Sequence, residues 1–123
     1  MANAAALLFL VAALFCHMLT GDAQRFCGKS GVTFSVRTTG NVVGGQPEYV
    51  VAIGTSCSCP MMYVRVWCDG LEDSAVPLDA SKVEVQDGMC VLKQAVAKDS
   101  PVVFKYSSKV PVNFRVFNAS PRC

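Results

Sequence analysis

The sequence predicts an all-β fold: a disulfide-bonded antiparallel β-sandwich of about seven short strands, following an N-terminal signal peptide. Three observations support this fold class. Apolar and polar residues alternate over short runs, turn-forming Gly, Pro and Ser separate the runs, and no stretch after residue 23 has a helical period. Strand number alone does not distinguish a sandwich from a closed barrel, so the barrel remains the alternative.

Residues 1–23 have the pattern of a secretory signal peptide. Residues 4–19 form an almost continuous apolar run, and Gly21 and Ala23 supply the small residues that favour cleavage after Ala23. The alternatives are a membrane anchor and a buried N-terminal helix. The run is shorter than the roughly 20 residues that span a bilayer, and no basic cluster follows it. We therefore expect a secreted protein with one domain, residues 24–123, and no membrane contact after cleavage.

Cleavage changes the counts of cysteine and histidine. Cys16 and His17 both lie in the predicted signal peptide, so residues 24–123 retain six cysteines and no histidine. An even number of cysteines in a short secreted chain predicts a disulfide framework. These cysteines are Cys27, Cys57, Cys59, Cys68, Cys90 and Cys123. Their pairing is left open by the sequence.

Two expectations about the cysteines follow from their positions. Cys57 and Cys59 are two residues apart, and a bridge between them would close a strained ring, so we expect each to pair with another cysteine. Cys123 is expected to anchor the last strand, because an unattached end would fray.

The residue types present argue against an enzyme. Without histidine, residues 24–123 cannot form a Ser-His-Asp or Cys-His centre or any zinc site that uses histidine. A zinc site built from cysteines alone stays open, although an oxidising compartment favours disulfides. No G-x-S-x-G motif or P-loop occurs, and no two carboxylates have a spacing that predicts glycoside cleavage. We expect no catalytic residue, no cofactor and no metal.

The first three strands are predicted from period-2 alternation. A strand over residues 32–39 precedes a loop over residues 40–47, which contains three glycines and a proline, and a second strand covers residues 49–53. The third strand covers residues 62–68 and is expected to be the spine of the domain. In it, Met62, Val64, Val66 and Cys68 alternate with Tyr63, Arg65 and Trp67.

The rest of the chain predicts an irregular stretch and four further strands. Residues 69–81 contain Gly70, Pro77 and four acidic residues, and they predict the longest loop. The expected elements after it are strands over 81–86 and 90–92 around an Asp87-Gly88 turn, and strands over 102–106 and 112–116. Residues 94–99 are the only place for one helical turn.

Charges are unevenly distributed along the chain. Residues 69–87 carry six acids and one base, whereas residues 88–123 carry six bases and one acid. If these charges cluster in space, they would steer encounter with a charged partner. The alternative is two ordinary solvated regions. We expect no nucleic-acid partner.

An ordered set of motifs resembles one known family. The motifs are Cys27, Pro47-Glu-Tyr-Val-Val-Ala-Ile53, Cys57-x-Cys59, Val64-x-Val66-x-Cys68, Gly70-Leu71, Cys90-Val-Leu92, Phe104-x-Tyr106 and Cys123. Together they resemble the tapetum-determinant-like family of small secreted cysteine-rich plant proteins, over nearly all of residues 24–123. The resemblance implies a signalling ligand in the apoplast that binds the ectodomain of a leucine-rich-repeat receptor kinase and directs cell fate in anther development. The central cysteine spacing and the loop at 69–81 differ from the family pattern, which leaves another receptor or tissue open.

Three side chains form the candidate partner-binding site. Tyr63, Arg65 and Trp67 share one face of the third strand, and such a group suits an interface hot spot if the face is exposed. The alternative is that this face is core, with Arg65 lying over Trp67. If exposed, Tyr63 and Trp67 would also suit a cell-wall carbohydrate-binding module, and a small apoplastic defence protein is the third class of function.

One modification site is predicted. Asn118-Ala-Ser120 is an N-glycosylation sequon with a permitted middle residue. Pro121 follows directly and should lower its occupancy.

Overall fold

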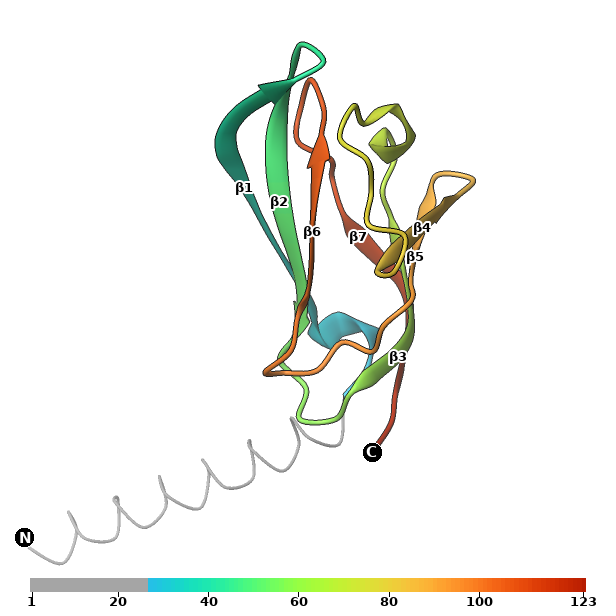
Figure 1. Ribbon diagram of the computed structural model, residues 1–123. Coiled ribbons are helices and arrows are strands. Elements are labelled where there is room, and N and C mark those ends of the chain that lie inside the picture. The colour runs from blue at the N-terminus through green and yellow to red at the C-terminus, as the bar shows by residue number, and fades with distance from the viewer. Residues whose placement is uncertain (1–26) are drawn as a thin grey trace, which may run out of the picture.

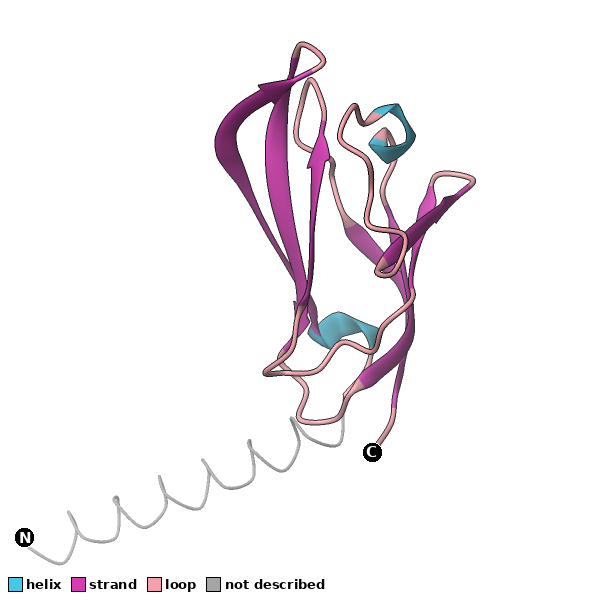
Figure 2. Cartoon of the chain, in the orientation of Figure 1, coloured by secondary structure: helices cyan, strands magenta, loops and turns pink. Residues whose placement is uncertain are grey.

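The computed structural model describes residues 27–123, so the predicted signal peptide lies outside the described residues. The described chain forms two antiparallel sheets that face each other (Figures 1 and 2). One sheet has the strand order β1-β2-β6, and the other has the order β4-β5-β3-β7. The strands are β1 (Val32–Val43), β2 (Gln46–Thr55), β3 (Met61–Trp67), β4 (Val83–Gln86), β5 (Met89–Leu92), β6 (Val102–Ser107) and β7 (Arg115–Pro121). The predicted sandwich is confirmed, and the barrel alternative is wrong.

The β1–β2 hairpin is longer than predicted. Its turn consists of Gly44 and Gly45, whose φ angles of 58° and 75° lie in the left-handed region that glycine adopts without strain. The predicted loop from residue 40 is therefore wrong: β1 continues to Val43 through a bulge between Thr38 and Val42. Only the second half of that glycine-rich stretch turns the chain, because a Gly-Gly pair is enough for a tight hairpin.

The alternation in β3 is interrupted by a bulge. Tyr63 has a φ of 53°, and the pairing of β3 with β7 shifts register between Met62 and Arg65. The extra residue changes which methionine faces inward: Met61 is fully buried and Met62 only partly so. The predicted grouping of Met62 with Val64, Val66 and Cys68 on one face therefore fails at Met62, whereas Val64, Val66 and Cys68 are all fully buried.

Residues 94–99, the only place that the sequence leaves for a helical turn, do not form one. Val96 instead forms a bridge with Met61, with backbone hydrogen bonds of 2.7 and 2.9 Å in the two directions. Val96 is fully buried, so this crossing segment extends the edge of the core.

The last strand begins later than predicted. Val112 and Phe114 are buried, but they lie in the irregular segment before β7 rather than in a strand over 112–116. The backbone N–H of Val112 donates to the Tyr106 hydroxyl at 3.3 Å, so a side chain takes the place of a strand partner. Buried and exposed residues therefore alternate over 112–115 although residues 112–114 pair with no strand.

The core lies between the two sheets and is aromatic at one end. The Tyr106 ring lies 5.4 Å from that of Tyr49 and 5.7 Å from that of Phe114, centroid to centroid. Phe114 also packs against Phe34 from β1 and Phe104 from β6. Stacked and edge-to-face ring pairs add stability beyond the area that they bury.

Three disulfides use all six cysteines of the described residues. Cys57 pairs with Cys27, and Cys59 pairs with Cys123. The third bridge, Cys68–Cys90, joins the end of β3 to β5 and is fully buried. The neighbours Cys57 and Cys59 therefore pair with different, distant cysteines.

The acidic loop, residues 69–81, and Lys82 after it protect the edge of β6. The Ser107 hydroxyl accepts from the Ala75 N–H at 2.7 Å and donates to Gln46 Oε1 at 2.8 Å, and Ser74 Oγ accepts from the Ser107 N–H at 2.9 Å. Farther along, Lys82 Nζ donates to the Val103 carbonyl at 2.7 Å. The loop thus uses polar groups of an edge strand that could otherwise pair with another chain.

Candidate partner-binding face

The outer face of the four-stranded sheet carries the three side chains predicted to contact a partner. All three lie on β3, whose opposite face is packed into the core through Val64 and Val66. Tyr63 is 62% exposed, Arg65 is exposed, and Trp67 is half-buried. The alternative that this face is core is therefore wrong for Tyr63 and Arg65.

Strand β7 adds further aromatic and basic side chains to the same face. The ring of Phe117, which is 44% exposed, meets Trp67 edge-on at a centroid distance of 5.4 Å and an angle of 77°. Arg115 is the direct cross-strand partner of Trp67 and shares its side of the sheet. Together with Arg122, these residues define the aromatic–arginine face: Tyr63, Arg65, Trp67, Arg115, Phe117 and Arg122.

Arg122 packs against Tyr63 at the surface. Its guanidinium carbon lies 5.8 Å from the centroid of the Tyr63 ring, and Nη2 donates to the tyrosine hydroxyl at 3.4 Å. The backbone N–H of Arg122 also donates to the Pro60 carbonyl at 2.8 Å, so the arginine is held at both ends. The expected contact of Arg65 over Trp67 is not among the cation–π pairs of the described residues, where Arg122 and Tyr63 form that contact instead.

The face has a positive charge without acidic partners. Among residues 27–123 the ion pairs are Lys82–Asp79 and Lys93–Glu84, both at 3.9 Å, and neither involves an arginine. Lys93–Glu84 joins the acidic and basic segments of the sequence, so the two segments do not form separate charged surfaces there. Within the described part of the chain, Arg65, Arg115 and Arg122 form no ion pair, so their guanidinium groups can bind carboxylates of a partner.

The sequon borders this face. Asn118 is exposed on β7 and stands opposite Arg65 in the strand pairing. As the direct cross-strand partner of Arg65, Asn118 shares its side of the sheet, so a glycan on its side chain would rise from the aromatic–arginine face.

Half of the face was missed by sequence reasoning. The predicted last strand ends at Val116, which leaves out Phe117 and Arg122, and Arg115 is counted only among the six bases of residues 88–123. The sequence does contain a pattern that indicates these two residues, because Arg115 and Phe117 alternate with the inward-facing Val116. What the sequence does not show is that β7 lies next to β3, so that the two sets of side chains form one surface.

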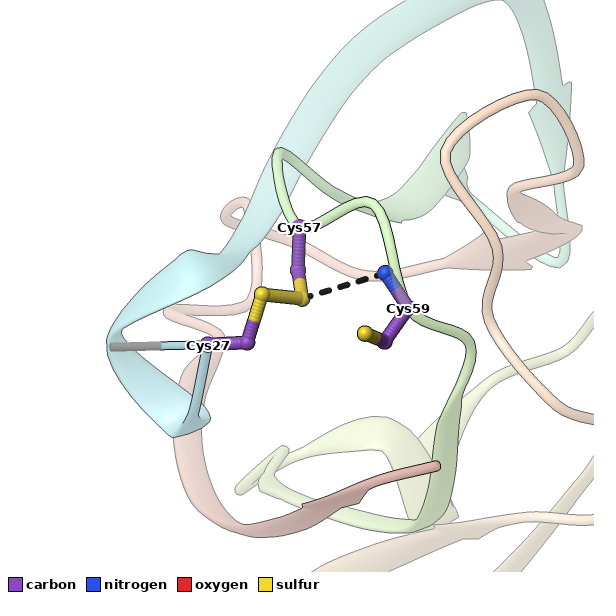
Figure 3. Close-up of side chains that lie close together, drawn as sticks. All are labelled: Cys27, Cys57 and Cys59. Atoms are coloured by element: carbon purple, nitrogen blue, oxygen red, sulfur yellow. Dashed lines mark hydrogen bonds between the residues drawn. A yellow bond between two sulfur atoms is a disulfide. The ribbon is translucent and has the colours of Figure 1, made fainter. Parts of the chain in front are cut away.

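A second cluster consists of sulfur atoms. The Sγ atoms of Cys27, Cys57 and Cys59 all lie within 4.8 Å of one another, from the lead-in before η1 (Lys29–Gly31) and the loop between β2 and β3 (Figure 3). Such a set could hold a soft metal ion only as thiolates. All three sulfurs are bonded in disulfides, so the oxidised protein offers no thiolate here.

These features define a class of protein: a small β-sandwich, joined by three disulfides, that presents an aromatic and basic face on one sheet. Within residues 27–123, no helix has the length and apolar character that crossing a membrane requires.

The chain belongs to the tapetum determinant 1 family, because the family profile described as "Tapetum determinant 1, C-terminal" matches residues 28–123. The family resemblance predicted from the order of the cysteines is confirmed. No curated protein and no solved structure gives a significant match.

Proposed function

We propose that this protein is a secreted, non-catalytic signalling ligand that binds the ectodomain of a leucine-rich-repeat receptor kinase and directs cell differentiation in anther development. Membership of the tapetum determinant 1 family supports this role. The observation that carries the binding site is the exposure of Tyr63 on a sheet whose other face is buried, beside three arginines that form no ion pair among residues 27–123. Tyrosine, tryptophan and arginine are the residues that most often dominate interface energetics.

Secretion is supported by the cysteine chemistry. Three disulfides in a domain of this size are typical of oxidising, extracellular compartments. The signal-peptide pattern of residues 1–23 also supports export to the extracellular space. The apoplast is therefore the proposed location.

Rigidity also supports binding through this face. Strand β3 is flanked by Cys59 and Cys68, each bridged to a distant part of the chain, and its inner side chains are fully buried. The bridges and the buried inner side chains restrict the backbone that carries Tyr63, Arg65 and Trp67 before a partner arrives. A preorganised surface loses less conformational entropy on binding than a mobile one.

The test is direct binding of oxidised, refolded mature protein to immobilised receptor-kinase ectodomains, with insoluble cell-wall glucans as a parallel arm. Saturable ectodomain binding is expected. Tyr63→Ala and Arg65→Glu should each weaken it by roughly 30-fold, the effect of losing one hot-spot residue. Arg37→Glu is the matched control, because Arg37 is exposed on β1 in the other sheet and should leave binding unchanged.

Three outcomes would contradict the proposal. Retention on glucan that depends on Tyr63 and Trp67, without ectodomain binding, would favour the cell-wall module. Direct action on a microbe or an enzyme without ectodomain binding would favour a defence protein. Ectodomain binding that Arg37→Glu and Arg65→Glu weaken equally would move the site away from the aromatic–arginine face.

A further inference from the structure

Two of the three disulfides form one cluster of four sulfur atoms. Cys27, Cys57 and Cys59 have their Sγ atoms within 4.8 Å of one another, and the sulfur of Cys123 is bonded to that of Cys59. Figure 3 shows the Cys59 sulfur beside the Cys27–Cys57 bond. Figure 1 places the C end and the loop between β2 and β3 at the same end of the sandwich. A thiolate formed on Cys59 would therefore lie close to a second disulfide.

The bridges differ in their access to solvent. Cys123 is exposed and Cys59 is half-buried, whereas Cys68 and Cys90 are both fully buried. Cys57 is also buried, so the Cys27–Cys57 bond is screened on one side. A dissolved thiol will reach the Cys59–Cys123 bridge first, because the rate of exchange depends on access to a sulfur atom.

We propose that Cys123 is a site of reversible mixed-disulfide formation with a small monothiol, and that Cys59 passes this exchange on to the Cys27–Cys57 bridge. In the first step an external thiolate attacks the sulfur of Cys123. A bond forms between these two sulfurs, the Cys59–Cys123 bond breaks, and its electron pair leaves on Cys59 as a thiolate.

The second step transfers the exchange within the cluster. The Cys59 thiolate attacks the sulfur of Cys27, a Cys27–Cys59 bond forms, and Cys57 leaves as a thiolate. In the third step Cys57 attacks Cys123 and expels the external thiolate unchanged. The product has Cys27–Cys59 and Cys57–Cys123 bridges. The three steps together therefore isomerise two disulfides with no net oxidation or reduction.

A backbone hydrogen bond selects the leaving sulfur. The N–H of Cys59 donates to the sulfur of Cys57 at 3.3 Å (Figure 3). A hydrogen bond to a charged sulfur stabilises the thiolate, and a more stable thiolate leaves faster. Attack of Cys59 on Cys57 itself would close the strained ring between residues two apart in sequence. Cys27 is therefore the sulfur that Cys59 attacks.

This exchange would act on the candidate partner-binding face, a consequence that rests on the proposed function. Arg122, which packs on Tyr63, directly precedes Cys123. While Cys123 carries the external thiol, the end of the chain after β7 is no longer bonded to Cys59. The contact of Arg122 with Tyr63 then loses its nearest covalent support.

The test exposes the oxidised, folded mature protein to increasing concentrations of reduced glutathione, traps free thiols by rapid alkylation, and maps adducts and bridges by mass spectrometry. The expected first adduct is on Cys123, followed by a cross-linked peptide that joins Cys27 to Cys59. The Cys68–Cys90 peptide should survive throughout. A first adduct on another cysteine, absence of the Cys27–Cys59 peptide, or simultaneous loss of all three bridges would overturn the proposal.

A double variant separates relayed exchange from direct attack. With Cys59→Ser and Cys123→Ser, the Cys27–Cys57 bridge should survive the glutathione concentrations that open it in the wild-type protein. Opening at the wild-type rate would show direct attack and overturn the relay. If this variant does not fold, brief alkylation of the wild-type protein during the exchange tests the relay instead. Alkylated Cys57 on molecules that carry glutathione at Cys123 would support the relay. Absence of alkylated Cys57 on those molecules would contradict it. None of these readouts depends on a receptor, so failure of the exchange and failure of the proposed function are distinguishable.

Discussion

At the scale of single residues, the structure gives Tyr106 a role that its position in a strand does not reveal. Its side chain is fully buried, and its hydroxyl accepts from the N–H of Val112 in the segment before β7. Burial is the main cause that raises the pKa of this hydroxyl, and the hydrogen bond from Val112 acts in the opposite direction. The tyrosine thereby satisfies a backbone group in a segment that has no strand partner.

Tyr106→Phe should lower the free energy of unfolding by about 1–3 kcal/mol, because it leaves the buried N–H of Val112 unpaired. Urea unfolding followed by Trp67 fluorescence measures this change. Tyr63→Phe is the matched control, since its hydroxyl is exposed and its only hydrogen bond among the described residues is the surface contact with Arg122. Equal unfolding midpoints for the two variants would contradict the role of Tyr106.

Glu48 is a second residue whose partners are set by the fold. Its carboxylate accepts from Thr39 Oγ1 at 2.7 Å and from Asn41 Nδ2 at 3.2 Å, both on the bulged part of β1. The hydrogen bond from Thr39, followed by that from Asn41, lowers the pKa of Glu48 below its ordinary value. The ionised carboxylate therefore stabilises the folded state.

The pH dependence follows from the direction of this shift. Stabilisation by Glu48 is fully present above the pKa of an unfolded glutamate, about 4.3, and is lost as pH falls through the lower pKa of the folded state. Glu48→Gln should therefore flatten the acid limb of a plot of unfolding free energy against pH. Glu72→Gln, at an exposed position in η2 (Leu71–Asp73), should leave that limb unchanged. An acid limb of the same slope in Glu48→Gln and the wild type would contradict this assignment.

At the scale of elements, the β1–β2 hairpin meets the acidic loop at its tip. A Cβ atom on Gly44 would lie 2.7 Å from the Cβ of Ala75, whereas one on Gly45 would meet nothing within 4 Å. Ala75 is held by the Ser107 hydroxyl, so it cannot move away freely. The two neighbouring glycines share left-handed backbone angles and differ in this contact.

Gly44→Ala should therefore destabilise the domain more than Gly45→Ala. Both variants lose the glycine that a left-handed angle favours, at a cost of about 1–2 kcal/mol. Gly44→Ala also forces the hairpin tip and the loop apart, and amide exchange at Ala75 and Val76 should become faster in this variant alone. Equal destabilisation with unchanged exchange at these amides would show that the hairpin tip does not depend on the loop.

At the scale of the whole molecule, stability depends on covalent links between distant segments. The three bridges span 30, 64 and 22 residues of sequence. Each contributes about 2–4 kcal/mol, which is a large part of the 5–15 kcal/mol typical of a domain. The bridges join both ends of the described chain to the loop before β3 and join β3 to β5.

Full reduction should unfold the protein. Excess dithiothreitol is expected to abolish the β-type far-UV circular dichroism spectrum at 25 °C, because the sandwich is too small to compensate for three lost bridges. Protein treated with the alkylating reagent alone is the control and should keep its spectrum. A spectrum unchanged by the reductant, with six free thiols counted, would contradict the structural role of the bridges.

The fold class was predictable because its signals are local. Alternation in β2, β3 and β6 reflects which side chains face the core, and each strand carries that pattern in its own residues. The six cysteines and the absence of histidine after residue 23 are also properties of composition. These features were enough to indicate the family.

Strand pairing decided the features that the sequence left open. The bulge at Tyr63 places Met61 rather than Met62 in the core. The sequence does not show this bulge, because it depends on the register of β3 against β7. The aromatic–arginine face likewise exists because β7 returns to lie beside β3, about 50 residues farther along the chain.

By itself, then, the sequence determined a disulfide-bonded sandwich and which side chains of its third strand share a face, because periodicity and composition are properties of the local sequence. Which of the two faces is exposed was decided by the structure. Only the tertiary structure decided that Cys57 bonds Cys27 while Cys59 bonds Cys123, and that Arg122 lies on Tyr63. Those contacts join segments separated by 30 residues or more, and their geometry is fixed only when the strands have paired.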